Sequence, residues 1–372
     1  MSSTVNLGSI FGIQFRLHFS WFVIFTLVTV FLSWQVFPPA LLEQSQLVYW
    51  TMGAVTSLLF FASVVTHELA HGLVGRANGI TIKSITLFIF GGAAHMTREP
   101  SKAAQELRMA VAGPISSLVM AGLFWMVWNT FSSTGPQLAL MALWLAQINL
   151  VLAVFNLFPG FPLDGGRVLR ALVWHFSGSY KKATRVATQA GRVVGYLFVL
   201  GGATIIILYQ EWLSGVWLGL IGLFLESTAR ASYKQAMLQQ VLQGMTAGEV
   251  MLSDCRRVSA ETTVSQLAME YGDSGEECFI VAGEGRAEGI IALHNIVSVA
   301  KSEKGATRLG EIARPLEKLS IAKPGDDVLG IVQHMNEAGH DEVAVMSQDG
   351  LVGLITLESL IKLVNRHPDF NS

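Results

Sequence analysis

Apolar residues are gathered into long runs over about the first 230 residues of the chain. A helix needs about 20 apolar residues to cross a bilayer. The pattern therefore predicts a polytopic α-helical membrane protein with about six transmembrane helices, of which the last two, joined by a short turn, could instead form one hairpin. The first run is too long for a signal-peptide core, so it is expected to remain as an anchor. The runs cover residues 19–37, 48–74, 109–131, 138–158, 193–209 and 212–229.

Beyond residue 245 the pattern shortens to strands and amphipathic helices, and the segment repeats itself. Residues 279–296 align with residues 343–360 at a constant offset of 64 (343 − 279 = 64). Two copies of this kind predict one paired α/β domain. The expected organisation is a transmembrane domain at 1–234, a helical connector at 235–244 and a paired domain at 245–372, with copies at about 245–305 and 306–366.

Composition supports this division into two parts. The chain is 51% hydrophobic and only 14% charged, which departs from soluble proteins toward membrane proteins. Residues 1–235 hold 14 Lys and Arg against 7 Asp and Glu, whereas residues 236–372 hold 11 against 20. Cys255 and Cys278 form no CxxC pair, so both are expected to be reduced thiols. No nucleic-acid partner is expected.

The basic residues indicate how the helices are oriented. The connections 38–47 and 132–137 contain no Lys or Arg, while the alternate connections are rich in both. By the positive-inside rule, both termini and the paired domain are predicted to be cytoplasmic, in the plasma (inner) membrane of a prokaryote. This orientation puts His67 and His71 near the cytoplasmic end of the second span, with Asp164 at a similar depth after the fourth.

The sequence His67-Glu68-Leu69-Ala70-His71 lies inside an apolar run. Histidines at i and i+4 share one face of a helix and can bind one zinc ion. Ionisable groups at membrane depth are costly and usually functional. Because two histidines and a carboxylate form a known catalytic zinc set, Asp164 is the predicted third ligand of one zinc ion per chain.

Two further residues have expected roles in hydrolysis. Glu68, next to a ligand, is the predicted general base, and Asn156 is the predicted hydrogen-bond donor to an oxyanion. Each assignment has a structural alternative: hydrogen-bonded histidines with a solvated Glu68, a loop-capping Asp164, and an Asn156 that ties backbone carbonyls at a helix end. His18 and His95 are expected to be surface or hydrogen-bonded residues and not ligands.

In the segment 80–96, a run of β-branched and aromatic residues is followed by two glycines, which predicts a strand or hairpin. A substrate helix must be unwound before its peptide bonds can be attacked, and an exposed strand edge can hold the extended form. Gly91, Gly92 and Ala93 are therefore predicted to lie beside the substrate. The alternative is a re-entrant turn without substrate contact.

These motifs together resemble the site-two protease family of intramembrane zinc metalloproteases. The resemblance implies that His67, His71 and Asp164 bind zinc, that Glu68 is the base and that Asn156 faces substrate. It also implies cleavage of transmembrane or membrane-proximal segments of single-span proteins. The resemblance is carried by the HELAH sequence, the match of residues 156–166 to NxxPxxPxDGG, Gly91-Gly92-Ala93, Ala112-Gly113-Pro114, and residues 11–18.

The repeated tail resembles tandem cystathionine-β-synthase (CBS) motifs. Such pairs bind adenine nucleotides in a cleft and commonly dimerise, and the resemblance implies contacts from Asn295 and Thr356. The nucleotide pattern is eroded, because Ala292 stands where threonine is expected and Ser359 replaces the ribose-contacting aspartate. Nucleotide binding, homodimerisation and substrate docking therefore remain alternatives for the tail.

Two other classes of membrane protein compete with the protease. One is a transporter or channel regulated by the CBS pair, with a structural metal site; the other is a di-iron oxidase. A transporter needs polar groups along a path through several spans, whereas here the ionisable residues gather at one depth, including Glu226 late in the sixth span. A di-iron oxidase needs more histidine pairs at metal spacing than His67 and His71.

Overall fold

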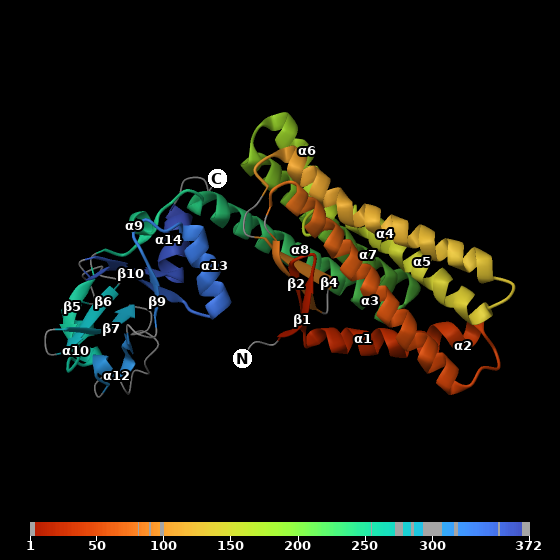
Figure 1. Cartoon of the computed structure of the whole chain (residues 1–372), viewed down its shortest axis with the longest axis horizontal. Coiled ribbons are helices and arrows are strands. Elements are labelled where there is room, and N and C mark those ends of the chain that lie inside the picture. Colours follow the sequence, from red (N-terminus) through yellow and green to blue (C-terminus); the bar gives the residue numbers. More distant parts are fainter. Residues whose placement is uncertain are drawn as a thin grey trace. The chain divides into compact units, whose positions relative to one another are not determined.

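The computed structural model describes residues 4–80, 82–88, 91–96, 100–253, 255–271, 278–283, 286–292, 307–315, 319–348 and 350–366. The chain divides into two compact units, residues 1–233 and 234–372. The first, here the membrane unit, combines long apolar helices with a small sheet (Figure 1). The second, here the C-terminal unit, consists of two small sheets with short helices.

The part of the chain that the structure describes contains six helical segments long and apolar enough to span a membrane, as the sequence predicts. The last two apolar runs form separate helices, each of about 30 residues. In the first segment, a π-helical turn at Leu32–Val36 joins two α-helices. The six segments are α1–α2 (Ser20–Phe31 and Phe37–Ala40), α3 (Gln46–Ala77), α4 (Ala103–Phe131), α5 (Pro136–Asn156), α7 (Tyr180–Tyr209) and α8 (Trp212–Leu242).

Helices α3, α4 and α5 run side by side in the membrane unit (Figure 1). The outward faces of the long helices are apolar and exposed, as lipid contact requires. On α7, for example, Leu197 and Leu200 are 59% and 63% exposed. The inward faces carry small and polar residues, which allow close approach of helices where lipid offers no hydrophobic drive for association.

Small polar residues fasten α1 to α3. The Thr29 hydroxyl donates to the Ser57 hydroxyl at 3.0 Å, and Ser33, in the π-helical turn after α1, donates to the Tyr49 carbonyl of α3 at 3.1 Å. A Cβ atom at Gly53 would lie 2.1 Å from the Ser33 hydroxyl oxygen. The spacing of four residues on each helix gives a small-xxx-small contact, a common form of helix packing in membranes.

Glycines bring α7 and α8 into similarly close contact. A Cβ atom at Gly202 would lie 2.4 Å from the Gly215 carbonyl oxygen, and one at Gly195 would lie 2.7 Å from the Gly222 carbonyl oxygen. The neighbouring Gly201 has more room, because its nearest contact would be a leucine methyl group at 3.5 Å. The two helices therefore meet along one face of α7 with their backbones nearly touching.

A four-stranded sheet of order β1-β2-β3-β4 packs against α3. Antiparallel hairpins β1–β2 and β3–β4 are joined by parallel pairing of β2 with β3, so helices α1 to α3 form the crossover. The predicted strand segment at 80–96 contains the second hairpin, whereas the first hairpin was not expected. The strands are β1 (Thr4–Ile10), β2 (Ile13–His18), β3 (Ile82–Phe88) and β4 (Gly91–Met96).

The C-terminal unit repeats its strands at the spacing expected from the sequence. Strand β6 (Cys278–Gly283) becomes β10 (Glu342–Ser347) when 64 is added to its bounds, and β7 (Arg286–Ala292) becomes β11 (Gly350–Thr356). Each copy also has a parallel strand and a helix before its hairpin. These are β5 (Arg256–Ser259), α10 (Val264–Tyr271), β9 (Ser320–Ala322) and α13 (Val328–Ala338); α9 (Ala247–Val250), α12 (Leu309–Ile312), β8 (Arg314–Pro315) and α14 (Leu357–Arg366) complete the unit.

The expectation of two reduced thiols is wrong for this structure, in which Cys255 and Cys278 form a disulfide. Strands β5 and β6 pair in parallel, with Arg256 opposite Phe279. The residues immediately before this pair are the two cysteines, whose Cα atoms are 4.8 Å apart. The two cysteines are 23 residues apart and form no CxxC motif. They come together because β5 and β6 pair side by side after the crossover through α10.

The glycine contact between α7 and α8 predicts a difference between two adjacent substitutions. Gly202→Ala should lower the free energy of unfolding by about 1–3 kcal/mol, since the added methyl group meets backbone of α8. Gly201→Ala should change it by about 0.5 kcal/mol or less, since its methyl group finds ordinary contact distances. Unfolding of both variants in detergent measures the difference, and equal stability would contradict close α7–α8 packing.

Candidate metal centre

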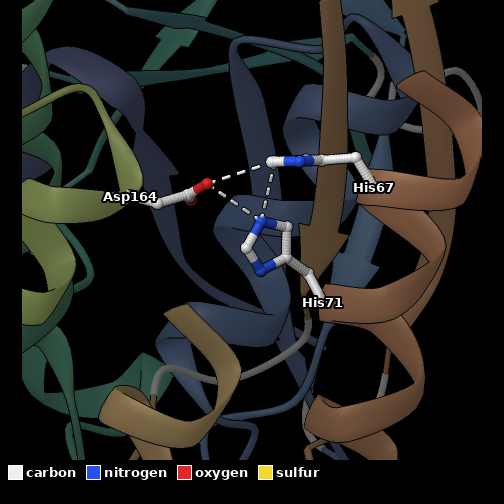
Figure 2. Close-up of side chains that lie close together, drawn as sticks. All are labelled: His67, His71 and Asp164. Atoms are coloured by element: carbon white, nitrogen blue, oxygen red, sulfur yellow. Dashed lines mark hydrogen bonds and ion pairs between the residues drawn. The ribbon is translucent and has the colours of Figure 1, made fainter. Parts of the chain in front are cut away.

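Two histidines of α3 and one aspartate of α6 (Asp164–Ser177) converge inside the membrane unit. His67 and His71 lie one helical turn apart and are 4% and 6% exposed. Their Nε2 atoms are 3.2 Å apart, and each lies 3.1 Å from Oδ2 of Asp164. Figure 2 shows both rings turned toward the carboxylate, which reaches them from the start of α6.

The other ring nitrogens are held by α4. Nδ1 of His71 lies 2.7 Å from the Met109 carbonyl oxygen, and Nδ1 of His67 lies 2.9 Å from the Ser117 hydroxyl. A carbonyl oxygen only accepts, so Nδ1 of His71 carries the hydrogen and Nε2 is the nitrogen that faces Asp164. Outer hydrogen bonds of this kind orient metal-binding histidines.

The donor set fits zinc. Zinc binds nitrogen and oxygen ligands at about 2.0–2.1 Å, so ligand atoms at tetrahedral angles lie about 3.3 Å apart. The three sides of the observed triangle are 3.1, 3.1 and 3.2 Å. Two imidazoles and one carboxylate that point at one another form a donor set that suits a bound cation.

One face of α4 supports both histidines. Met109, Gly113 and Ser117 recur every four residues, so they form a single stripe on the helix. A Cβ atom at Gly113 would lie 2.1 Å from Nε2 of His71 and 2.6 Å from Nε2 of His67. Gly113 lies within one of the motifs that carry the family resemblance, but the sequence alone predicts no role for it or for Ser117. Their spacing of four from Met109 is the signal that could have identified the stripe.

Asp164 is fixed by close packing at the N-terminus of α6. A Cβ atom at Gly165 would lie 2.2 Å from the Leu157 carbonyl oxygen, and one at Gly166 would lie 2.3 Å from the Gly160 carbonyl carbon. Neither glycine can be larger without moving α6 away from the turn that precedes it. The first residue of a helix also suits a negative charge, because the helix dipole is positive there.

Glu68 is half-buried and lies against β4. A Cβ atom at Gly92 would lie 2.4 Å from Cγ and 2.8 Å from Cδ of Glu68. In β4, Gly91, Gly92 and Ala93 pair with Phe88, Leu87 and Thr86 of β3. Since β4 is the last strand of the sheet among the residues described, its other edge is not used by this sheet.

Asn156 is the last residue of α5 and is half-buried. Within the part of the chain that is described, no contact joins it to the three ligand residues, so its role stays a prediction. His18 hydrogen-bonds Ser20 at the start of α1, at 2.8 Å. His95 belongs to β4 and pairs with Ser84 through the backbone.

In the C-terminal unit, Thr356 and Ser359 bind each other. The Ser359 amide donates to the Thr356 hydroxyl at 2.9 Å, and the Thr356 amide donates to the Ser359 hydroxyl at 3.2 Å. Thr356 is 3% exposed and stands where α14 begins. This geometry makes the pair a helix cap. Asn295, the other expected nucleotide contact, lies outside the described residues.

Known proteins with similar sequences are zinc metalloproteases. A model of peptidase family M50 matches residues 55–141 and 137–201. A protein of Synechocystis, sll0528, named as a candidate zinc metalloprotease, is 33% identical over 368 residues, which are 97% of this chain and 96% of that protein. Rip3 of Mycobacterium tuberculosis, named in the same way, is 30% identical over 98% of this chain and 94% of its own. The chain belongs to peptidase family M50.

Other matches cover the two parts of this M50 peptidase. The zinc metalloprotease MJ0392 of Methanocaldococcus jannaschii is 27% identical over 365 residues, 98% of this chain and 97% of that protein. The solved site-2 protease of the same organism is 31% identical and covers 61% of this chain and 94% of its own, with a TM-score of 0.42. A CBS domain model matches residues 309–366, the second copy of the repeat.

Family membership decides between the classes considered from sequence. The M50 peptidase is a zinc metalloprotease and an integral membrane protein. The predicted resemblances to site-two proteases and to CBS domains are confirmed. The named relatives favour the protease over a transporter or a di-iron oxidase.

Glu226, the ionisable residue late in α8, accepts hydrogen bonds from Arg192 and Tyr196 at 3.0 and 3.2 Å.

The α4 stripe predicts that the metal centre of the M50 peptidase does not tolerate a methyl group at Gly113. Gly113→Ala should weaken zinc binding by about tenfold or more, because overpacking costs about 1–3 kcal/mol and here meets both imidazoles. Gly122→Ala, on the same helix with nothing within 4 Å, is the control and should bind zinc normally. Competition with a chromogenic chelator measures both affinities; equal values would remove Gly113 from the site.

Proposed function

We propose that this M50 peptidase cleaves a peptide bond within or next to the transmembrane segment of single-span proteins. The observation that carries the proposal is the convergence of His67, His71 and Asp164 on one point among apolar helices. Three donor atoms that face one another in a medium of low dielectric constant attract a cation strongly. A metal held at this depth can act on a substrate that is itself in the membrane.

The residues around the metal centre divide the work of hydrolysis. Zinc bound there would supply a Lewis acid that lowers the pKa of water and polarises the scissile carbonyl. Glu68, adjacent to His67, takes a proton from the water and returns it to the leaving amine. Asn156 donates its amide N–H to the oxyanion that develops on the carbonyl oxygen.

The substrate is bound as an extended segment along β4. Peptide bonds of a transmembrane helix are protected by internal hydrogen bonds, so the helix must unwind locally before attack. An edge strand offers new partners to the unwound backbone. The packing of Gly92 against Glu68 supports this role, because it holds one face of β4 against the proposed general base and so keeps a segment bound along the strand near it. Gly91, Gly92 and Ala93 would then flank the scissile bond.

The proposed orientation has both termini and the C-terminal unit in the cytoplasm, with the metal centre near the cytoplasmic face of a prokaryotic plasma membrane. The asymmetric distribution of Lys and Arg between connections supports it. The proposed boundaries remain a transmembrane domain at 1–234, a connector at 235–244 and a CBS pair at 245–372. We assign the CBS pair a regulatory role. The mutual capping of Thr356 and Ser359 favours dimerisation or substrate docking over nucleotide binding.

Replacement of the general base should abolish cleavage while zinc is retained. Glu68→Gln keeps the size of the side chain but removes its basicity, so kcat should fall by about a hundredfold to ten-thousandfold. The measurement is cleavage of a model single-span substrate by detergent-purified enzyme, with zinc content measured on the same sample. Glu211→Gln, an exposed position between α7 and α8, is the control. Undiminished cleavage by Glu68→Gln would exclude Glu68 as the base.

Replacement of Asp164, the third predicted ligand, should release zinc, whereas Glu68→Gln should retain it. Asp164→Ala leaves two imidazoles without the anion, so the purified variant should lose most of its zinc and all measurable cleavage. Zinc per chain is measured by atomic emission beside Glu68→Gln, which should retain the ion. A full complement of zinc in Asp164→Ala would exclude the aspartate from the ligand set.

A further inference from the structure

A buried ion pair lies close to the metal centre but contributes no ligand to it. Glu106 of α4 is 0% exposed and Arg170 of α6 is 3% exposed. Nε of Arg170 donates to Oε1 of Glu106 at 2.6 Å, and Nη2 reaches the same oxygen. A fully buried ion pair stabilises a fold little better than well-packed apolar residues of the same volume. Its presence therefore calls for a role beyond general stability.

Arg170 holds more than Glu106. Its Nη1 donates to the Tyr180 hydroxyl at 2.7 Å, where α7 begins. The guanidinium also stacks over two rings, at 5.0 Å from the centre of Phe161 and 4.9 Å from the centre of Tyr180. Phe161 belongs to the turn that leads into Asp164. One flat, branched cation thus joins α4, this turn and the start of α7, which a lysine ammonium cannot do.

The joined segments are those that carry the two halves of the metal centre. On α4, Glu106 precedes Met109 by three residues, about one helical turn, and Met109 orients His71. On α6, Arg170 follows Asp164 by six residues. The histidines come from α3 and lean on α4, whereas the carboxylate comes from α6. The Glu106–Arg170 pair is therefore a direct polar link between the support of the imidazoles and the helix of the carboxylate.

We propose that Arg170 is a positioning residue, with Glu106 as its partner, which holds Asp164 at metal-binding distance from His67 and His71. The inference rests on the zinc site of the proposed function. Loss of the link would let α6 move relative to α4, so the carboxylate would spend less time within reach of both imidazoles. The consequence is weaker zinc binding, with little change in how substrate binds once the metal is in place.

The chain offers a matched control in a second arginine–glutamate pair. Arg192 of α7 donates to Glu226 of α8 at 3.0 Å. Neither helix carries a predicted metal ligand. Arg192→Lys and Glu226→Gln therefore disturb a more exposed arginine–glutamate pair of the same unit without touching α4 or α6.

The test compares Arg170→Lys and Glu106→Gln with these controls in full-length, detergent-solubilised enzyme. Zinc affinity is measured by competition with a chromogenic chelator on the folded, monodisperse fraction. Arg170→Lys and Glu106→Gln should bind zinc about 10–100-fold more weakly, the usual effect of removing an outer-shell partner. Cleavage should recover at saturating zinc, with an unchanged KM for the model substrate. The controls should keep the wild-type zinc affinity.

Two results would overturn the inference. One is a wild-type zinc affinity in folded Arg170→Lys and Glu106→Gln; the other is an equal loss in the Arg192 and Glu226 controls, which would indicate general loosening. If Arg170→Lys does not fold, Tyr180→Phe replaces it, because this variant removes one hydrogen bond of Arg170 and keeps the ring. Tyr180→Phe should also weaken zinc binding. Wild-type enzyme that binds zinc but cleaves no membrane substrate would refute the proposed function and leave the positioning role supported.

Discussion

The membrane unit depends on bringing three lone-pair donors to one point in an apolar interior. Two imidazoles and a carboxylate face each other at 3.1–3.2 Å, and each is kept from turning away by a second contact or by its backbone. In a medium that cannot solvate them, these groups must be satisfied by shared protons or by a bound cation. The unusual packing nearby follows from this requirement, because ring orientation and helix position must both be held within narrow limits.

Helix α4 supplies most of that control without contributing a ligand. The Met109 carbonyl and the Ser117 hydroxyl orient the two imidazole rings, and the absence of a side chain at Gly113 leaves room for them. Glu106 on the same helix binds α6 through Arg170. The sheet acts on the other side of α3, where β4 packs on Glu68. The HExxH helix is thus enclosed between a rigid helix and an edge strand. One support orients the predicted metal ligands, and the other faces the proposed general base.

Much of this architecture could be predicted from the sequence, because it depends on local patterns. Six apolar runs become six long helices, and an offset of 64 residues becomes two copies of one strand pair. What could not be predicted depends on long-range packing. The disulfide between Cys255 and Cys278 follows from strand register, and the roles of Gly113 and Arg170 follow from which helices touch. A single sequence contains the residues for such contacts but does not say which of them meet.

The separation of the ligands along the chain affects how the protein is made. Asp164 follows His67 by 97 positions and His71 by 93, with α4 and α5 between them. A nascent chain that has inserted only its first two spans has both imidazoles but neither their carboxylate partner nor the supporting stripe. The predicted three-residue ligand set is therefore complete only after α6 has been synthesised. Until then, the chain lacks the carboxylate that would complete the metal centre.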